Sequence, residues 1–364
     1  MKLAFGFSVL VILTTNIVLG QDKTDSYLNK KWKDVATKMP INWYGSDEAK
    51  LVAENVLLSQ KGIGGWEKNK AYHQPFSETE KEHYLKDKDE VGATFDNSAT
   101  ITELRFLAKV YFNFNDTRYK QAFIKGLEYI FESQYKNGGW PQYYPLRSGY
   151  YCRITYNDDA MVNILKFLDE IISDNKEFTA LQISKENKIK AQEAFNKGLD
   201  CIVKTQIIID NKPTVWCAQH DETTLAPAKA RSYELPSFSG SESVGVTLLL
   251  MSIETPSDEI IAAVNGAVQW FENNKIRGIK LESETDKNGK KNRIVVEDAT
   301  ASPLWGRFHD LETNKPYFCS RDGIKKNSLA EISHERRNGY SWYTSSPERV
   351  LKEFLTWEMK LKAK

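Results

Sequence analysis

The sequence predicts a mainly α-helical fold: an incomplete α/α toroid of repeated helical hairpins, with irregular and short β segments forming the other wall of a cleft. Three observations support this prediction, namely a recurring sequence unit, apolar residues at helical spacing within it, and polar residues at matching helix starts. Each unit ends in an amide residue shortly before a glycine or tryptophan, and the unit recurs at intervals of roughly 70 residues. The four amide residues are Gln60, Gln134, Gln206 and Asn274.

Each unit is interpreted as a helical hairpin. The closing helices are expected at 52–60, 126–134, 198–206 and 266–274, and the opening helices at 100–112, 160–172, 243–253 and 348–360. Three opening helices follow polar triplets at 96–98, 157–159 and 241–243, which are interpreted as N-caps. Hairpins repeated in one sense place their loops around one shared mouth, whereas a solenoid would spread them along an extended edge.

Residues 1–20 are predicted to be a secretory signal peptide, because Lys2 precedes an apolar run that ends at the small residue Gly20. The run is shorter than the ~20 apolar residues of a membrane helix. We therefore expect residues 21–364 to form one secreted or periplasmic, monomeric domain without a membrane span. The net charge of +1 gives no general electrostatic case for nucleic-acid binding.

Acidic residues at the predicted mouth suggest a metal site. Asp158 and Asp159 precede one opening helix, where a single carboxylate would suffice as a cap and the second could bind a hard cation. Asp221 lies in the next mouth loop, so it could converge with Asp159 on one ion. Oxygen ligands favour calcium, and the five scattered histidines disfavour zinc.

Basic and aromatic residues follow these acidic loops. Lys229 and Arg231 lie in the segment Lys229–Ser237, and Arg307 and Arg321 lie in two later aromatic segments. Arginine matches a carboxylate with its planar fork, and an aromatic face such as that of Trp140 can stack on a sugar ring. Calcium, arginines and aromatic residues together predict a site for a sugar polymer that carries carboxylates.

Six motifs, in order along the chain, resemble the pectate lyases of polysaccharide lyase family 10. They are Asn137–Gln142, Asn157–Met161, Gln219–Asp221, Ala230–Ser237, Pro303–Phe308 and Ser320–Gly323. The resemblance covers nearly all of the chain from about Trp43 onward. It implies calcium-dependent cleavage of α-1,4-linked polygalacturonate by β-elimination, which leaves 4,5-unsaturated oligogalacturonides.

The resemblance also implies residue roles. Asp159 and Asp221 match the family's calcium-binding acids, and Asp158 is adjacent to them. Arg231 corresponds to the catalytic base, with Arg277 and Arg293 as fallback candidates, and Arg307 and Arg321 correspond to substrate-binding arginines. Lys229 and Trp140 are further candidates for substrate binding.

Two other functions remain open from the residues. An inverting glycoside hydrolase on an α/α toroid needs only two separated carboxylates, which Asp159 and Asp221 could supply. A non-catalytic oligogalacturonide-binding protein would need the same arginines. Neither a serine-hydrolase elbow nor a phosphate-binding loop occurs in the sequence.

Overall fold

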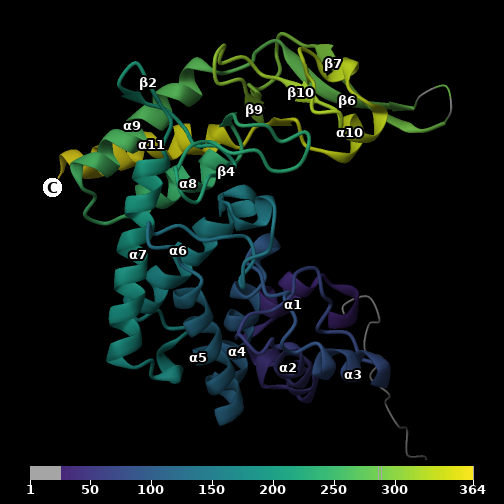
Figure 1. The fold of residues 1–364 in the computed structure, drawn as a ribbon, viewed down its shortest axis with the longest axis vertical. Helices are drawn as coiled ribbons and strands as arrows, with labels where there is room; N and C mark the ends of the chain where they lie inside the picture. Colours follow the sequence, from purple (N-terminus) through teal and green to yellow (C-terminus); the bar gives the residue numbers. More distant parts are fainter. Residues whose placement is uncertain (1–25, 286, 288, 364) are drawn as a thin grey trace, which may run out of the picture.

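The computed structural model describes residues 26–285, 287 and 289–363. The predicted signal peptide therefore lies outside the described residues, and secretion stays a prediction. The described part is mainly helical, as expected, with 11 α-helices and short strands (Figure 1). None of its helices is both long enough and apolar enough to cross a membrane.

Three helical hairpins form the centre of the fold. They are α4 (Ile101–Phe114) with α5 (Thr117–Glu132), α6 (Ala160–Ile172) with α7 (Lys185–Thr205), and α8 (Glu242–Ser252) with α9 (Asp258–Asn273). Opening helices contact opening helices and closing helices contact closing helices, so the hairpins stack side by side in two layers.

Further helices flank this array at both ends. On the N-terminal side lie α1 (Trp32–Lys38), α2 (Asp47–Ser59) and α3 (Glu78–Lys86); on the C-terminal side lie α10 (His334–Gly339) and α11 (Pro347–Lys362). Helix α1 packs on α4, and α11 packs on α8 and α9. In Figure 1, α1 and α11 lie at opposite ends of the array, which is the arrangement of an incomplete toroid.

The recurring glutamine joins successive hairpins. Its side-chain amide donates one hydrogen bond to a carbonyl in its own loop and a second to a carbonyl of the next closing helix. These bonds are 2.7–2.9 Å long and run from Gln60 to Gly64 and Ala122, from Gln134 to Gly138 and Ala194, and from Gln206 to Thr214 and Ala263. The sequence repeat is thus a repeat of inter-hairpin contacts.

The tryptophan that follows each unit is a core residue. Its indole nitrogen donates to a carbonyl of its own closing helix at 2.8–2.9 Å, from Trp66 to Val56, Trp140 to Ile130, Trp216 to Ile202 and Trp305 to Phe271. All four side chains are buried. A Cβ at Gly198 would lie 3.0 Å from the Trp140 ring, so this glycine lets α7 approach the indole.

Short two-stranded sheets and a second core complete the fold. The longest sheet is the hairpin of β6 (Ile279–Thr285) and β7 (Lys291–Glu297). The other pairs are β1 (Ile154–Thr155) with β4 (Gln219–His220), β2 (Ile208–Ile209) with β3 (Lys212–Pro213), β5 (Phe238–Ser239) with β9 (Phe308–His309), β8 (Trp305–Gly306) with β12 (Tyr343–Thr344), and β10 (Phe318–Cys319) with β11 (Lys325–Lys326). Tyr233, Phe308, Phe318 and Trp342 belong to a hydrophobic cluster distinct from the helical core.

The predicted polar caps form a different structure. Residues Asp96–Ser98 and Asn157–Asp159 are 3₁₀ turns, named η4 and η6, and the N-cap positions of α4, α6 and α8 make no side-chain cap hydrogen bond in the described part of the chain. The capping interpretation of these triplets is therefore wrong. Asp116 and Ser257 cap α5 and α9 instead.

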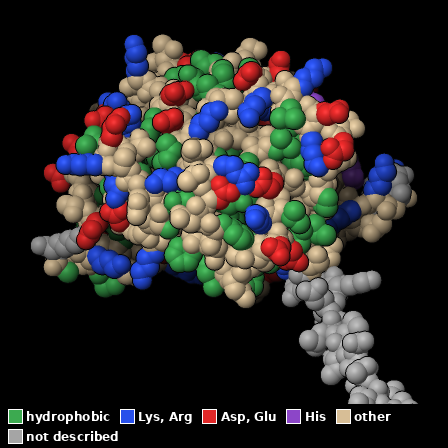
Figure 2. Space-filling view, turned by 90° about the horizontal axis from the view of Figure 1, so that it is seen from below, with side chains coloured by type: hydrophobic (Ala, Val, Ile, Leu, Met, Phe, Trp, Pro, Cys, Tyr) green, Lys and Arg blue, Asp and Glu red, His purple; other side chains and the backbone are tan. Residues whose placement is uncertain are grey.

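Charged side chains are mixed over the surface. On the face drawn in Figure 2, basic and acidic side chains alternate without a broad region of one sign. This distribution agrees with the net charge of +1. Charge near the functional site must therefore be examined locally.

Candidate active site

Two equivalent turns position the acidic residues of the site. In η4, Asn97 has φ 53° and ψ 31°, and in η6, Asp158 has φ 53° and ψ 30°. These are left-handed conformations, which asparagine and aspartate tolerate better than most residues. The two turns contact one another at the starts of α4 and α6. Backbone strain of this kind is often found at functional sites.

The turns face a cavity of about 260 Å³. Its lining includes three carboxylates, two basic residues and two glutamines: Asp96, Asp158, Glu234, Lys68, Arg231, Gln142 and Gln219. Lys68 forms an ion pair with Asp96, and its ammonium lies 5.8 Å from the centroid of the Tyr143 ring. The cavity thus combines both signs of charge in a small volume.

Two buried amide oxygens in this lining lack partners. Gln142 Oε1 and Gln219 Oε1 are inaccessible to solvent and have no hydrogen-bond partner among the described residues. A buried acceptor left unsatisfied costs about 1–3 kcal/mol. Two carboxylates and two unpaired amide oxygens form an all-oxygen donor set, which is the chemistry that calcium prefers.

The surroundings of the Asp158 carboxyl shift its pKa. Desolvation and then the charge of Asp96 raise its pKa, whereas Arg307 acts in the opposite direction. Asn157 connects the two sides, because its amide donates to Asp158 Oδ2 at 2.8 Å and its Oδ1 accepts from Arg307 Nη2 at 3.2 Å. A cation near Asp96 and Asp158 would relieve the repulsion between their carboxylates.

Arg231 is held in one orientation by Glu234. Its Nε and Nη2 donate to the two carboxylate oxygens at 2.7 and 2.5 Å, and the Tyr340 hydroxyl donates to Glu234 Oε1 at 2.6 Å. Burial opposes the charge of Arg231, but its bonds to Glu234 raise its pKa above the ordinary value. The arginine side chain is 40% exposed while Glu234 is only 6% exposed. Glu234 therefore orients a guanidinium that reaches the cavity.

Arg307 and Arg321 lie on the same wall as Arg231. Arg307 is paired with Glu242, and its guanidinium carbon is 4.5 Å from the centroid of the Tyr340 ring. Arg321 is exposed and lies 5.7 Å from the centroid of the Tyr233 ring, which is also 5.3 Å from Arg231. The two tyrosine rings contact each other at 5.1 Å. The structure thus brings the three predicted arginines around one pair of aromatic rings.

A larger cavity of about 770 Å³ lies on the other side of Asp158, which lines both cavities. Asp159, Lys166, Arg307 and Arg349 also line this larger cavity. Asp158 therefore borders both cavities.

Three comparisons with known proteins bear on this cleft. A sequence profile of the family described as "Pectic acid lyase" matches residues 60–351. The chain belongs to this family. A search of curated proteins gave no match.

Two solved structures of a family 10 polysaccharide lyase from Cellvibrio cellulosa are similar to this pectic acid lyase. The first, an aspartate-to-alanine mutant in complex with trigalacturonic acid, is 35% identical with a TM-score of 0.75, over 87% of this chain and 95% of that one. The second is 35% identical with a TM-score of 0.74, over 88% and 96%.

The family and these likenesses confirm the predicted membership in polysaccharide lyase family 10 and the toroidal fold. The protein is a polysaccharide lyase of the pectate lyase family, and neither the glycoside hydrolase nor the non-catalytic alternative is retained.

In the structure, Asp159 lines the larger cavity, whereas Asp221 is bonded within its own turn, and their assignment as metal ligands stays a prediction. Asp221 Oδ1 accepts hydrogen bonds from the amides of Thr223 and Thr224, and Oδ2 is paired with Arg153. Asp221 is not among the described residues that line either cavity. Within the described residues, no group of three or more His, Cys, Asp or Glu side chains is placed to hold a metal.

The turn of Asp221 occurs twice in the chain. Residues 220–227 and 309–316 share the pattern H-D-x-x-T-x-x-P. Asp310 Oδ1 accepts from the amides of Glu312 and Thr313, and Oδ2 is paired with Lys325, as Asp221 does with its own neighbours. Each aspartate therefore holds the conformation of its own loop through the same set of hydrogen bonds.

Trp140 is not available to stack on a sugar. Its side chain is 1% exposed, and both its burial and its bond to Ile130 place it in the helical core. Lys229 is exposed but is not among the described residues lining either cavity, and the same holds for the fallback Arg277. Arg293, the other fallback, donates to the Tyr340 carbonyl at 2.8 Å.

Lys68, Asp96, Gln142 and Gln219 line the cavity but are not among the predicted site residues. The repeat carries a usable signal for Asp96, because Asp96-Asn97 stands before α4 as Asn157-Asp158 stands before α6. Gln142 and Gln219 lie within two of the six motifs, which assign them no role, and Lys68 lies in none of them.

Proposed function

We propose that this lyase cleaves α-1,4-linked polygalacturonate by calcium-dependent β-elimination and releases 4,5-unsaturated oligogalacturonides. The observation that carries the proposal is the cavity lined by Asp96, Asp158, Lys68 and Arg231, together with two glutamines whose buried amide oxygens lack hydrogen-bond partners among the described residues. The likeness to a lyase in complex with trigalacturonic acid supports this class of substrate.

The oxygen-rich lining fits a calcium ion. Asp96 and Asp158 would hold it, and the Gln142 and Gln219 oxygens could complete the donor set directly or through water. When bound, calcium would neutralise a substrate carboxylate and so make the adjacent C5 proton more acidic. This assignment replaces Asp159 and Asp221 with Asp96 as the partner of Asp158.

Arg231 is proposed to receive the C5 proton. Its raised pKa means that it begins the reaction charged, so it must release a proton as it accepts one. Glu234, whose own pKa is lowered by Arg231, keeps the guanidinium oriented, and the proton that Arg231 releases goes to the leaving C4 oxygen. The C5–H and C4–O bonds break, a C4–C5 double bond forms, and the proton finally resides on the released C4 oxygen. Water is not consumed.

The other arginines are proposed to bind the polymer. Arg307 and Arg321 lie against the rings of Tyr340 and Tyr233. Their planar guanidinium groups can donate hydrogen bonds to the carboxylates of sugar units on either side of the bond that is cleaved. Lys229, which is exposed near Cys319, remains a candidate for a more distant contact.

Ultraviolet absorbance of the unsaturated uronide tests this function. The protein, incubated with polygalacturonate and calcium, should raise the absorbance, and EDTA should abolish the rise until calcium is restored. A rise that persists in EDTA would exclude the calcium dependence. New reducing ends without any rise would indicate hydrolysis and exclude β-elimination.

A further inference from the structure

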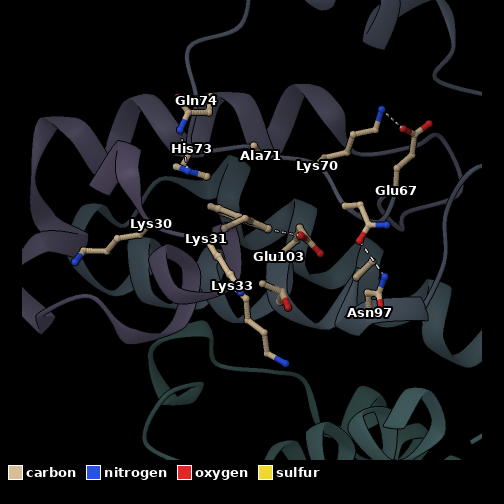
Figure 3. A pocket seen from close by; sticks show the side chains of 14 residues that line it. Lys30, Lys31, Lys33, Glu67, Lys70, Ala71, His73, Gln74, Asn97 and Glu103 are labelled. Carbon is tan, nitrogen blue, oxygen red and sulfur yellow. Dashed lines mark hydrogen bonds and ion pairs between the residues drawn. The ribbon is translucent and has the colours of Figure 1, made fainter. Parts of the chain in front are cut away.

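A second cavity lies next to the proposed catalytic one. It has a volume of about 420 Å³ and is formed by residues 30–33, the 67–74 loop and the start of α4 (Figure 3). Asn69 and Asn97 line both this cavity and the one that contains Asp158. The Asn97 amide donates to Asn69 Oδ1 at 2.9 Å, so this pair marks the boundary between the two cavities.

Basic side chains are concentrated in this lining. Lys30, Lys31, Lys33 and Lys70 contribute to it, against two acidic residues, Glu67 and Glu103. Lys70 is paired with Glu67 at 2.9 Å, and Lys33 donates to Ser98 Oγ in the η4 turn at 3.1 Å. In Figure 3, the lysines of residues 30–33 lie on one side of Glu103, and Lys70 and Asn97 on the other.

The buried wall of the cavity carries two polar atoms without partners. Glu103 Oε1 accepts from the Trp32 indole at 2.6 Å, but Glu103 Oε2 has no hydrogen-bond partner among the described residues. His73 Nδ1 is likewise unpaired there, although its ring stacks on Trp32 with centroids 6.1 Å apart. Glu103 is 2% and His73 4% exposed. Both residues line the cavity, so their free atoms can be satisfied by something that enters it.

Glu103 carries only part of its negative charge near neutral pH. Burial raises the pKa of Glu103 to about 7. A protonated carboxyl can donate a hydrogen bond to a sugar hydroxyl or carboxylate. With Glu103 only partly ionised and Glu67 paired to Lys70, Lys31 and Lys33 make the cavity attractive to an anion.

We propose that this cavity, lined by Lys31, His73 and Glu103, is an additional subsite for a uronate unit of the same polymer, beyond Asn97 from the site of cleavage. The proposal rests on the proposed function, since it takes the substrate to be a polyanionic sugar chain. Partly exposed Trp32, lysines and unpaired polar atoms provide the apolar surface, charge and hydrogen bonds that a sugar acid requires. The shared asparagines favour a polymer over a separate small anion, because one chain can occupy both cavities.

Chain length provides the test. With wild-type protein, kcat/KM is measured on trigalacturonate and on hexagalacturonate, and their ratio is the readout. Lys31→Glu should lower the hexamer-to-trimer ratio about tenfold, because only the longer chain reaches the reversed charge. His73→Phe keeps a ring against Trp32 but removes Nδ1, and it should lower the same ratio to a smaller extent.

Lys38→Glu is the matched control. Lys38 is the last residue of α1, whose N-cap residue is Lys31; it is 70% exposed and paired with Asp34, but it does not line the cavity. The hexamer-to-trimer ratio of kcat/KM for Lys38→Glu should equal that of wild type. An unchanged ratio in Lys31→Glu, or equal losses on both chain lengths, would overturn the subsite.

Binding separates this proposal from the proposed function. Dissociation constants for the trimer and hexamer are measured by calorimetry with the same variants. If wild-type protein forms no unsaturated product on either chain, the proposed function fails, and a selective loss of hexamer affinity in Lys31→Glu still supports the subsite. Equal affinities of wild type and Lys31→Glu for the hexamer overturn it whatever the activity.

Discussion

Arg231 offers a test in which charge and geometry give different results. Arg231→Lys keeps the positive charge but loses the planar fork that Glu234 orients through Nε and Nη2. We expect kcat to fall by about two orders of magnitude or more while KM changes little, because the lost interaction acts mainly in the transition state. Steady-state kinetics on polygalacturonate measure this effect.

Arg307→Lys is the control for that measurement. Arg307 lies on the same wall and is also paired with a buried glutamate, so the substitution is chemically matched. We expect mainly a rise in KM. A near wild-type kcat in Arg231→Lys would remove Arg231 from the proton transfer.

Asp158 and Asp159 form a second matched pair. Both have left-handed backbones, with φ 53° and 58°, so Asn can replace either without new strain. Asp158→Asn removes a carboxylate from the cavity that contains Asp96 and should raise the calcium concentration for half-maximal activity at least about tenfold. Calcium titrations of the rate measure this.

Asp159→Asn should shift the calcium requirement less, because Asp159 lines the adjacent, larger cavity. Circular dichroism melting should show both variants folded. A larger calcium shift for Asp159 than for Asp158 would restore the sequence-based ligand assignment.

The types of residue in the site were easier to predict from the sequence than the individual residues. Arg231, Arg307 and Arg321 could be identified because a polyanion site requires arginines among aromatic residues. The role of Asp221 stays a prediction, because a carboxylate that accepts backbone amides in a turn can also bind a metal. Asp310 accepts backbone amides in an equivalent turn.

At the scale of elements, the recurring glutamine should stabilise the array. Gln206→Leu removes the two hydrogen bonds to the carbonyls of Thr214 and Ala263. We expect a loss of about 1–3 kcal/mol in the free energy of unfolding, because each of the two hydrogen bonds contributes about 0.5–1.5 kcal/mol. Chemical denaturation measures the loss.

Gln192→Leu on the same helix is the comparison. Gln192 is exposed and donates only to the Asn196 side chain, at 3.0 Å. The unfolding free energy should change by no more than about 0.5 kcal/mol. Similar losses in both variants would contradict the role of the glutamine as a link between hairpins.

The helices were predictable because their apolar spacing and their repeat are local properties. The expected closing helix 198–206 corresponds to the end of α7, and the expected opening helix 160–172 to α6. The turns before α4 and α6 were not predictable as strained turns. Aspartate and asparagine favour both N-caps and left-handed turns, so the sequence alone does not distinguish them. In the structure the two left-handed turns η4 and η6 contact each other, and this contact is not visible in the sequence.

At the scale of the whole molecule, buried titratable groups set the pH dependence of stability. His220 Nε2 accepts from the Cys217 amide at 3.0 Å, so its Nδ1 carries the proton bonded to the Leu225 carbonyl. Burial lowers the pKa of His220 and of His309 to about 4. The unfolded chain then binds protons more readily, and stability is lost as pH falls from about 6.5 toward 4.

Glu103 has the opposite effect on the pH dependence of stability. Burial raises its pKa from 4.5 to about 7, so the folded state holds a proton that the unfolded state has released between these values. Stability from the protonated carboxyl is complete below pH 4.5 and is lost as pH rises through 7. Below about pH 6.5 the stability lost through protonation of the two histidines is larger than the stability gained through Glu103. The combined contribution of these three groups to the free energy of unfolding is therefore greatest near about pH 6.5.

Glu103→Gln isolates the contribution of Glu103 to the pH dependence of stability. The amide oxygen can still accept from the Trp32 indole, but the side chain no longer ionises. Relative to wild type, the variant should gain stability between pH 5 and pH 8, by about 3 kcal/mol if the whole shift is expressed, because wild type must ionise a buried carboxyl over that range. Denaturation curves at both pH values give the difference. A gain of equal size at pH 5 and pH 8 would show that Glu103 affects packing and not proton binding, and no gain would show that its charge is already compensated by the lysines of the cavity.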